Sequence, residues 1–578
     1  MSKFKFLILN CSFTFCVLTF ALTCLAQDSD LEFSLDVTSN TTPLPKIFKP
    51  NIDLSGRGFH RQMSWPQELA AQEVLEAWEQ DIGFNGLYRL QYNLWEINQL
   101  AKDKEQQDKL LANYENIIRK INAGGGIVIL DLFGTPAGLG KVLDKKSPPW
   151  DPKAFKELVK TQIRNLSCQK RYNIWYEIWN APDLDDFFLG RKQEYFNLYR
   201  ALAESVKELE AETKIHIPIG GPSTSWWFQN LDGNTILTAE NSLIYELIRF
   251  CAHYKLPLNF ISWHTYSTDP KIEKGWTIYN KTPVALIRDW LSYFNFDRNL
   301  PLIVDEWNYD RNINVSVERK EKSFISSSYI PSRIKNMYEA GLDYQLYFSL
   351  EDFQNNKEAV VRNVGIFWFD PEGSNYKGGP KSTYNVFKML ANLGSDMFSA
   401  PAKFNDEFVG VIATKGKDYI AILVYNYIDP DVATSFLSKN IATLNGAERK
   451  MLLNLIKTDK LEKILAGQPD MANVRPRPTK KVKNLLKKVH ELNAQAAKFN
   501  SSSRNLTLSL KNLKANYLYQ RYAIDSSCSL DCEFTPLEKK EVNTTDLYQE
   551  TLTLSPYSVN LIVLKQKPPE EKNVPAEQ

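Results

Sequence analysis

The sequence is poor in the side chains that hold metal ions. Only 5 of its 578 residues are histidines, and none lies at the spacing of a metal-ligand pair. A phosphate-binding glycine loop is also absent, because Gly124-Gly125-Gly126 precedes an apolar run rather than a helix and is better interpreted as a turn. We therefore expect neither a metal nor another cofactor.

The chain has no excess charge of either sign. Its 70 lysines and arginines nearly balance 68 aspartates and glutamates, which leaves a net charge of +2. This balance excludes a protein that binds polyanions through its net charge, and we expect no nucleic-acid partner. Aromatic residues, by contrast, make up 12% of the chain. They suit core packing, and they also suit stacking on the flat faces of sugar rings.

Long apolar runs are absent after the amino terminus, where a membrane-spanning helix would need about 18 residues. Lys3 and Lys5 precede an apolar stretch over residues 6–26 that predicts a secretory signal peptide cleaved after Ala26. Polar residues within the stretch disfavour an uncleaved anchor. We expect a secreted or periplasmic protein with no membrane attachment once residues 1–26 are removed. The sequence does not indicate an oligomeric state.

Cysteine is scarce as well. Four of the 7 cysteines lie beyond residue 26, and of these only Cys528 and Cys532 are close in sequence. Their spacing suggests a local disulfide, which an exported protein permits, although the spacing alone does not decide whether they are bonded.

Short β-type runs alternate with amphipathic helical stretches between about residues 51 and 394, as in parallel α/β folds. Eight such runs lie near residues 52–54, 86–89, 127–131, 174–180, 217–221, 260–264, 302–306 and 344–348. Eight strands with intervening helices predict a (β/α)8 TIM barrel. Catalytic groups of such barrels sit at the carboxyl ends of the strands. Here those ends carry polar residues, namely Arg89, Asp131, Asn180, His264, Tyr266, Asp305 and Glu306.

The region after the barrel changes character. Residues 395–567 contain β-type runs with few helices between them, which predicts an appended antiparallel β-sandwich. Residues 27–50 form an amino-terminal extension that can join this sandwich. A helical insertion is expected over about 447–499, and residues 568–578 are expected to be disordered. The lysines at 480, 481, 483, 487 and 488 could touch an acidic polymer, but a solvated helix face is the favoured interpretation.

Glu306 closes the seventh apolar run and is a candidate nucleophile for glycoside hydrolysis. A retaining glycosidase needs two carboxyl groups, one as nucleophile and one as acid/base, and strand ends facing one another across a barrel mouth can supply them. On position alone, a structural carboxylate in an ion pair is an equally good interpretation of Glu306.

Several motifs resemble those of clan A glycoside hydrolases, and specifically family 39. Residues 175–184, Trp-Tyr-Glu-Ile-Trp-Asn-Ala-Pro-Asp-Leu, resemble the fourth-strand motif, and residues 305–308, Asp-Glu-Trp-Asn, resemble the nucleophile segment. Residues 263–267, Trp-His-Thr-Tyr-Ser, are similar to the sixth-strand segment, and residues 365–368 to the stretch that leaves the barrel. The resemblance implies a retaining glycoside hydrolase with a β-sandwich, acting on an oligo- or polysaccharide as a β-xylosidase, an α-L-iduronidase or an exopolysaccharide-degrading enzyme.

The sequence departs from the family at the position of the acid/base glutamate, which is Ala181. Alanine can neither protonate a leaving group nor activate water, so we expect impaired or altered hydrolysis. Either a deliberate inactivation or a natural departure would place alanine here, and the retained signal segment and tail favour the natural one. A displaced acid is conceivable at Glu177, which points to the same side of an extended strand, or at Asp183, Asp185 or Asp186.

The resemblance also implies roles for the other residues. Glu306 would form the glycosyl-enzyme, and Asn180 would bind the sugar 2-hydroxyl. Arg89 would keep the nucleophile ionised, while His264 and Tyr266 would position it or a sugar hydroxyl. Asp131 is a further candidate for substrate binding. Candidate sugar platforms are Trp226, Trp307 and Trp368, for each of which core packing is as good an interpretation. The alternative function is a natural carbohydrate-binding pseudoenzyme that keeps the cleft without hydrolysing.

Overall fold

The computed structural model describes residues 31–57, 64–231, 238–266, 271–274, 281–309, 322–354, 361–370, 377–399, 404, 406–441, 443–458, 460–465 and 477–567. The expected signal peptide and carboxy-terminal tail lie outside the described residues. Within them, no helix combines the length and the apolar character that crossing a bilayer requires.

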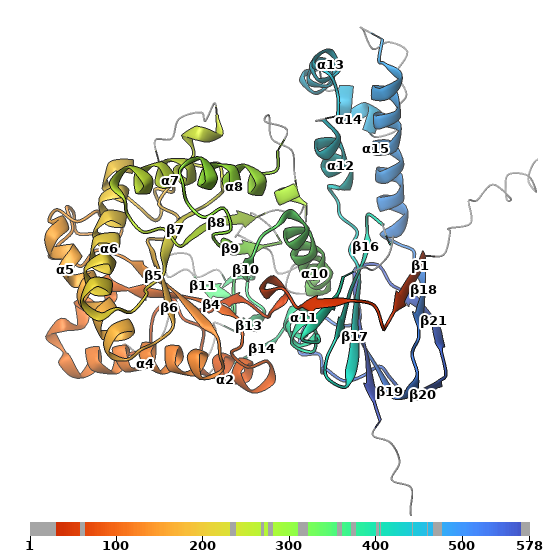
Figure 1. Ribbon diagram of the computed structural model, residues 1–578, viewed down its shortest axis with the longest axis horizontal. Coiled ribbons are helices and arrows are strands. Elements are labelled where there is room, and N and C mark those ends of the chain that lie inside the picture. The colour runs from red at the N-terminus through yellow and green to blue at the C-terminus, as the bar shows by residue number, and fades with distance from the viewer. Residues whose placement is uncertain are drawn as a thin grey trace, which may run out of the picture.

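Eight parallel strands close into the expected barrel, which lies on the left of Figure 1. The strands are β3 (Ile52–Asp53), β4 (Leu87–Asn93), β5 (Ile127–Phe133), β6 (Ile174–Ile178), β7 (Ile219–Thr224), β8 (Phe260–Tyr266), β9 (Leu302–Asn308) and β10 (Tyr344–Tyr347). Each coincides with one of the eight runs found in the sequence. The prediction of a TIM barrel is therefore confirmed.

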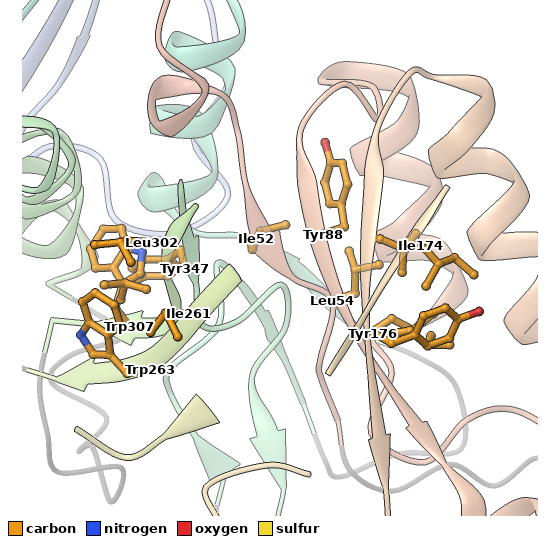
Figure 2. Close-up of a cluster of buried hydrophobic side chains, with 14 of the residues drawn as sticks. Ile52, Leu54, Tyr88, Ile174, Tyr176, Ile261, Trp263, Leu302, Trp307 and Tyr347 are labelled. Atoms are coloured by element: carbon orange, nitrogen blue, oxygen red, sulfur yellow. The ribbon is translucent and has the colours of Figure 1, made fainter. Parts of the chain in front are cut away.

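Helices surround the barrel. They are α2 (Gln72–Asp81), α3 (Leu94–Gln99), α4 (Lys104–Ala123), α5 (Pro152–Ile163), α6 (Lys192–Thr213), α7 (Leu243–Tyr254), α8 (Pro283–Tyr293), α10 (Ser323–Ala340) and α11 (Ser382–Ala391). Side-chain caps fix several starts: Asp151 accepts from the amides of Lys153 and Ala154 at the start of α5, where Pro152 occupies the first helical turn. Outward-facing strand residues such as Tyr88, Tyr176 and Trp307 fill the layer between strands and helices (Figure 2).

The second unit is a β-sandwich that contains both ends of the described chain. Its larger sheet has the order β2 (Thr41–Pro43), β15 (Asp396–Phe398), β16 (Val409–Lys415), β17 (Tyr419–Asn426), β22 (Ser558–Gln566), β19 (Ala515–Ile524), β20 (Glu538–Thr544). The smaller sheet is β1 (Leu31–Asp36), β18 (Arg504–Lys511), β21 (Leu547–Leu554). Strand β1 runs parallel to β18, so the amino-terminal segment is part of the sandwich and the two sheets are not wholly antiparallel.

Four helices interrupt the sandwich between β17 and β18. They are α12 (Val432–Ile441), α13 (Gly446–Lys457), α14 (Lys460–Leu465) and α15 (Lys480–Phe499), and they project away from the two domains in Figure 1. This insertion begins earlier than the sequence indicated, because residues 432–441 carry little of the charge that marks an amphipathic helix. It has its own small core, which includes Leu437, Leu452 and Leu486.

Barrel and sandwich share one continuous core. Helix α10 packs against β17 and β22, and the rings of Tyr329 and Tyr427 meet at 5.5 Å between centroids across that boundary. A disulfide joins Cys528 and Cys532, whose Cα atoms are 5.7 Å apart, whereas Cys168 and Cys251 are free and buried. The suggested local disulfide is thus present.

Candidate active site

The barrel interior is layered. Leu87, Ile129, Phe260, Ile303 and Leu346 form an apolar cluster of their own inside the strands. Two residues further along β4 and β5, toward their carboxyl ends, stand Arg89 and Asp131, which face the same side of their strands. A polar layer therefore rests on an apolar floor, and it lies at the end of the barrel where such folds bind substrates.

Arg89 is the centre of the polar layer and is 2% exposed. Its Nε lies 3.2 Å from Glu177 Oε2, and its Nη1 lies 3.2 Å from Asp53 Oδ2 and 3.6 Å from Glu306 Oε2. Asp131 and Asp305 approach the same guanidinium at 3.5 and 3.8 Å. Five carboxyl groups from four strands, β3, β5, β6 and β9, thus gather around one cation.

Two irregularities in neighbouring strands bring extra side chains into this layer. Between β7 and β8 the pairing steps from Pro222–Ser262 to Thr224–Trp263, which leaves Ser223 as an additional residue. Between β8 and β9 it steps from Trp263–Val304 to His264–Glu306, which leaves Asp305. In a regular strand, neighbouring side chains point to opposite faces; a bulge re-aims one of them. As a result Asp305 and Glu306 both lie beside Arg89.

Ser223 links three groups of the layer. Its Oγ donates to Asp305 Oδ2 at 2.7 Å and accepts from Arg89 Nη2 at 3.2 Å. Ser223 Oγ also lies 3.0 Å from His264 Nε2, and the tautomer of His264 decides which of these two atoms donates. Burial, and then the nearby Arg89, hold the pKa of His264 well below its ordinary value. His264 is accordingly neutral, and its Nδ1 lies 3.5 Å from Glu306 Oε2.

Glu306 lies at the open side of the layer and is 8% exposed. The Tyr266 hydroxyl donates a short hydrogen bond to its Oε1. Burial raises the pKa of Glu306 to about 7, against the opposing effects of Arg89 and of the Tyr266 hydrogen bond. Arg89 thus favours the ionised form of this carboxylate, as expected, but burial and the nearby Asp53 and Glu177 outweigh its effect on the pKa of Glu306.

Burial also outweighs the effect of Arg89 on the pKa values of the deeper carboxyl groups. Burial raises the pKa of Asp131 to about 7, despite the proximity of Arg89. It raises the pKa of Asp305 well above its ordinary value, with the charge of Glu177 acting in the same direction. Several protons are therefore held within the layer near neutral pH. Asp131 is 0% exposed, so it supports Arg89 from beneath and does not reach a substrate, contrary to the sequence-based suggestion.

Asn180 and Ala181 follow β6 at the rim of the layer. Asn180 Oδ1 accepts from Arg89 Nη2 at 2.9 Å, which orients its amide NH2 away from Arg89. Ala181 is 2% exposed, has a φ of 40°, and donates its backbone N–H to the Ser223 carbonyl at 2.9 Å. The position that the family resemblance assigns to an acid/base is thus next to the groups that hold Glu306, but its methyl group carries no proton.

Two of the carboxyl groups considered as a displaced acid have clear positions. Glu177 is 0% exposed, bonded to Arg89 and to the Ser262 hydroxyl, so it lies beneath the mouth and is unsuited to proton transfer with a bound substrate. Asp183 is half-buried and accepts hydrogen bonds from the Ser225 amide, at 2.8 Å, and hydroxyl. Burial raises the pKa of Asp183, although both Ser225 hydrogen bonds oppose the shift. Asp185 and Asp186 are exposed on the same loop.

The three tryptophans predicted as sugar platforms lie in different environments. Trp307 is 0% exposed, donates to Gln345 Oε1 at 2.7 Å and packs against Tyr347 outside the barrel strands, so it is a core residue (Figure 2). Trp368 donates to Asp531 of the sandwich at 3.0 Å. Trp226 is half-buried beside Trp227 after β7. Trp226 and Trp368 are both half-buried, but of these two only Trp226 has the loop position after a barrel strand that a platform needs.

Sequence reasoning missed Asp53 and Ser223. Asp53 belongs to a two-residue strand, and Ser223 is placed inward by a bulge. Their common signal would have been polarity at the ends of β3 and β7, which are two of the three runs without a predicted polar strand-end residue. Within the described ranges, no three His, Cys, Asp or Glu side chains form a group that could hold a metal ion.

Comparison with known proteins yields a family match. The model of the family described as "Glycosyl hydrolases family 39" matches residues 140–441, a stretch that includes Ala181, His264 and Glu306. A "Beta-xylosidase" of Caldicellulosiruptor saccharolyticus is 24% identical over 368 residues, which span 60% of this chain and 70% of that protein. A "Beta-xylosidase" of Geobacillus stearothermophilus is also 24% identical, over 300 residues, which span 49% of this chain and 53% of that protein.

A solved structure resembles the chain over almost its whole length. The crystal structure of the GH39 enzyme from Xanthomonas axonopodis pv. citri covers 94% of this chain and 100% of its own, with a TM-score of 0.61 at 16% sequence identity. At that identity the likeness concerns the fold, and it extends to the barrel and the sandwich together.

Proposed function

The chain belongs to glycosyl hydrolase family 39, and from this premise we propose that it is a retaining, β-xylosidase-like glycoside hydrolase whose hydrolysis is impaired by Ala181. The observation that carries the proposal is the position of Glu306, which lies at the mouth of the barrel, contacts Arg89 and receives the hydroxyl of Tyr266. The names of the two curated relatives support the xyloside preference. An oligosaccharide or an exopolysaccharide is the substrate class.

In the first step the ionised carboxylate of Glu306 attacks the anomeric carbon, and the bond to the leaving oxygen breaks with its electron pair on that oxygen. The amide NH2 of Asn180 donates to the sugar 2-hydroxyl, because its oxygen is already held by Arg89. Tyr266 orients Glu306 for attack. In the second step a water oxygen bonds to the anomeric carbon, the ester bond to Glu306 breaks, and Glu306 leaves as a carboxylate. The proton that this water loses passes to solvent, because position 181 offers no base.

Ala181 affects both steps. In the first step, no carboxylic acid protonates the leaving oxygen, and in the second none removes a proton from water. The loss of such a group typically slows a reaction by about 10² to 10⁴-fold. Substrates with acidic leaving groups need little protonation, so we expect them to react in the first step and to leave the enzyme trapped in the second.

The test compares the native chain with Ala181→Glu and Ala181→Gln on aryl β-xylosides that differ in leaving-group pKa. We expect Ala181→Glu to accelerate turnover by about 10² to 10⁴-fold, most strongly for poor leaving groups. Ala181→Gln is the matched control, since it fills the same space without an acid, and should leave turnover low. Azide should restore turnover in the native chain and yield a xylosyl azide, because it attacks the glycosyl-enzyme without base assistance.

The alternative is a carbohydrate-binding pseudoenzyme on the same barrel. It is favoured by the raised pKa of Glu306, since a protonated carboxyl group is not a nucleophile, together with the alanine at position 181. If Ala181→Glu remains inert on xylosides, glucuronides, iduronides and exopolysaccharides while binding them, the hydrolase proposal is wrong and the binding function stands.

We also propose that the protein acts outside the cytoplasm. The Cys528–Cys532 disulfide supports this location, because such bonds persist in oxidising compartments and are rare in the cytosol. The binding partner of the protein would be a carbohydrate. Detection of the chain in the extracellular or periplasmic fraction, without residues 1–26, tests the proposal, and a cytosolic chain of full length would contradict it.

A further inference from the structure

The four-helix insertion concentrates positive charge. Residues 432–499 contain 14 lysines and arginines against 5 aspartates and glutamates, a net charge of +9. Because the whole chain carries +2, the rest of it carries −7. Although the net charge of the whole chain is close to zero, the insertion is strongly basic and projects from an acidic remainder of the molecule (Figure 1).

Helix α15 displays this charge on one side and buries the other. Val482, Leu486 and Val489 lie in the core of the insertion, whereas Lys480, Lys481, Lys483, Lys487 and Lys488 are all exposed. Lys480, Lys483 and Lys487 follow one another at intervals of three and four residues, so they form one row along the helix. Within the described chain, no carboxylate lies within ion-pair distance of Lys480 or Lys483, and Lys487 meets only Glu491, at 3.7 Å.

This arrangement is unfavourable for the helix by itself. The amino-terminal end of a helix carries a partial positive charge that favours acidic side chains, yet the first turn of α15 has no acidic residue of its own and begins with Lys480 and Lys481. One carboxylate from another helix, Glu448 of α13, accepts a hydrogen bond from the Thr479 hydroxyl at this end. Like charges three or four positions apart, as in Lys483 and Lys487, also repel. A face selected only for solubility would avoid both costs, so the row has the character of a surface that meets a negatively charged partner.

The side chains of the insertion distinguish between classes of polyanion. The segment 432–499 has no tryptophan or tyrosine, and its Phe436 and Phe499 are partly or fully buried, so it lacks the exposed rings on which unpaired bases stack. Among its described side chains, none is a large exposed hydrophobic group of the kind that enters a lipid surface. A partner that offers only negative charge and hydroxyl groups fits this surface better.

The insertion is connected to the mouth of the barrel by further lysines. Lys271 and Lys274 lie just after β8, the strand that carries His264 and Tyr266, and Lys439 on α12 and Lys335 on α10 lie close enough to affect them. Burial lowers the pKa of Lys274 to about 7, and the three other lysines act in the same direction. Two glutamates lie among these lysines: Glu339 forms ion pairs with Lys274 and Lys335, and Glu407 forms one with Lys271.

We propose that the α12–α15 insertion is a docking surface for a carboxylated polysaccharide, held by the row Lys480, Lys483 and Lys487 and led along the lysines beside β8 toward the barrel mouth. The binding itself is independent of catalysis. The proposed role of this binding is to bring an acidic polymer to the cleft, and that role rests on the proposed glycoside hydrolase function.

The experiment measures binding of the full chain to polygalacturonate and to neutral xylan by affinity electrophoresis over a range of salt concentrations. The test variant is K480Q/K483Q/K487Q, in which glutamine retains the length and helix propensity of lysine. The control is K102Q/K104Q/K109Q, which removes three exposed lysines just before and within the first turns of α4 and changes the net charge equally. Lys104 and Lys109 form ion pairs with Asp108 and Glu105. Turnover of an activated aryl xyloside is followed in all three proteins.

We expect the native chain and the control to bind polygalacturonate with equal affinity, weakened by salt, and the test variant to bind about tenfold less tightly, since each exposed charge contact contributes a few-fold. Binding to neutral xylan should be unchanged. Equal affinity of the test variant and the control, or no salt-dependent binding by the native chain, would overturn the proposal. So would tighter, equally lysine-dependent binding to duplex DNA or to phosphatidylserine vesicles. Because aryl xyloside turnover depends on the cleft alone, it reports separately on the hydrolase function.

Discussion

Arg89 and the carboxyl groups around it set the protonation state of the cleft. Its guanidinium lies within 4 Å of Asp53, Asp131, Glu177, Asp305 and Glu306, so one positive charge faces five acids in a water-poor interior. Full ionisation would leave a large buried negative charge, which is costly, and the layer instead retains protons on some of its members. Glu306, the proposed nucleophile, is one of the groups whose pKa is raised.

This protonation predicts an unusual pH profile. Glu306 must be ionised to attack, and burial raises its pKa to about 7. In the native chain kcat/KM for an activated aryl xyloside should therefore rise with pH up to about 7 and then level, with no descending limb, because no acid at position 181 is lost at high pH. Measurement of kcat/KM between pH 4.5 and 9 tests this.

The Ala181→Glu variant supplies the control for the profile. It should add a descending limb at higher pH and produce a bell shape, since the introduced acid must remain protonated. A native profile that is already bell-shaped would show that another residue supplies the proton, and Asp183→Asn would then be the variant to examine, because the Asp183 carboxyl group is the half-buried one beside Ala181.

Ser223 is predicted to be a positioning residue. Ser223→Ala removes the hydrogen bonds to Asp305, Arg89 and His264, and should cost about 1 to 3 kcal/mol in the free energy of unfolding, since buried polar groups lose their partner. The pH at half-maximal kcat/KM should shift as well. Ser205→Ala is the control: this buried serine of α6 bonds to the Ala201 carbonyl and should change stability without moving the pH profile.

The elements of the barrel could be predicted from the sequence because they rest on local patterns. Apolar runs of strand length, separated by helices, placed all eight barrel strands, and polarity after those runs indicated Arg89, Asn180, His264 and Glu306. The pairing irregularities at Ser223 and Asp305 could not be predicted, because a bulge depends on the register between neighbouring strands and leaves no local signature. They decide which side chains enter the polar layer.

Other elements were missed for related reasons. Strands β19, β20 and β21 have mostly half-exposed or exposed residues, so their alternation is dominated by polar side chains and lacks an apolar run.

Trp307 follows Glu306 directly, and its role depends on the face of β9 that it occupies. It faces outward into the layer under α10, where Tyr329 packs against it with ring centroids 5.8 Å apart.

The insertion should behave as a separate cooperative element. Its core around Leu486, which is 2% exposed, is distinct from the barrel and sandwich cores. Leu486→Ala should destabilise it by about 2 to 5 kcal/mol. Hydrogen exchange should then quicken in α12–α15 and remain unchanged in the barrel strands; a uniform increase throughout the chain would contradict this autonomy. Lys487→Ala, on the exposed side of the same helix, is the control.

At the scale of the molecule, the shared core makes barrel and sandwich one folding unit. Helix α10 contributes Tyr329 to the boundary. Tyr427, which follows β17, and Val559 and Leu561 of β22 belong to the same core. Because the boundary is apolar and continuous, we infer that the two domains do not move as independent bodies. Stability changes in either domain should therefore appear in the unfolding of both.

Because the protein buries several acidic side chains, we expect its free energy of unfolding to decline as the pH rises toward neutrality. Burial raises the pKa of Glu96, Asp131 and Glu306 to about 7 from ordinary values near 4, so the folded protein binds more protons than the unfolded chain between these values. Stability is greatest below that window, is lost as pH rises through it, and levels above about pH 7. Urea unfolding at pH 5 and pH 7 measures the difference.

Glu96→Gln isolates one contribution to this slope. Glu96 is 5% exposed and lies apart from the Arg89 layer, with Gln67 as its backbone partner. Its replacement should reduce the decline in the free energy of unfolding by up to about 1.4 kcal/mol per pH unit. Glu73→Gln on the exposed side of α2 should leave the decline as it is. If both variants decline like the native chain, Glu96 titrates normally.

The pairing of β1 with β18 has a consequence for synthesis on the ribosome. Leu31 pairs with Leu506, so the first strand emerges roughly 475 residues before its partner. At about 5 to 20 residues per second, that delay is roughly half a minute to a minute and a half. During this time Phe33 and Leu35, both 1% exposed in the finished protein, have no sheet to cover them. A nascent chain halted after the barrel should therefore engage chaperones or aggregate through its first strand. Chaperone binding or aggregation should cease only in chains long enough to include residues 504–511.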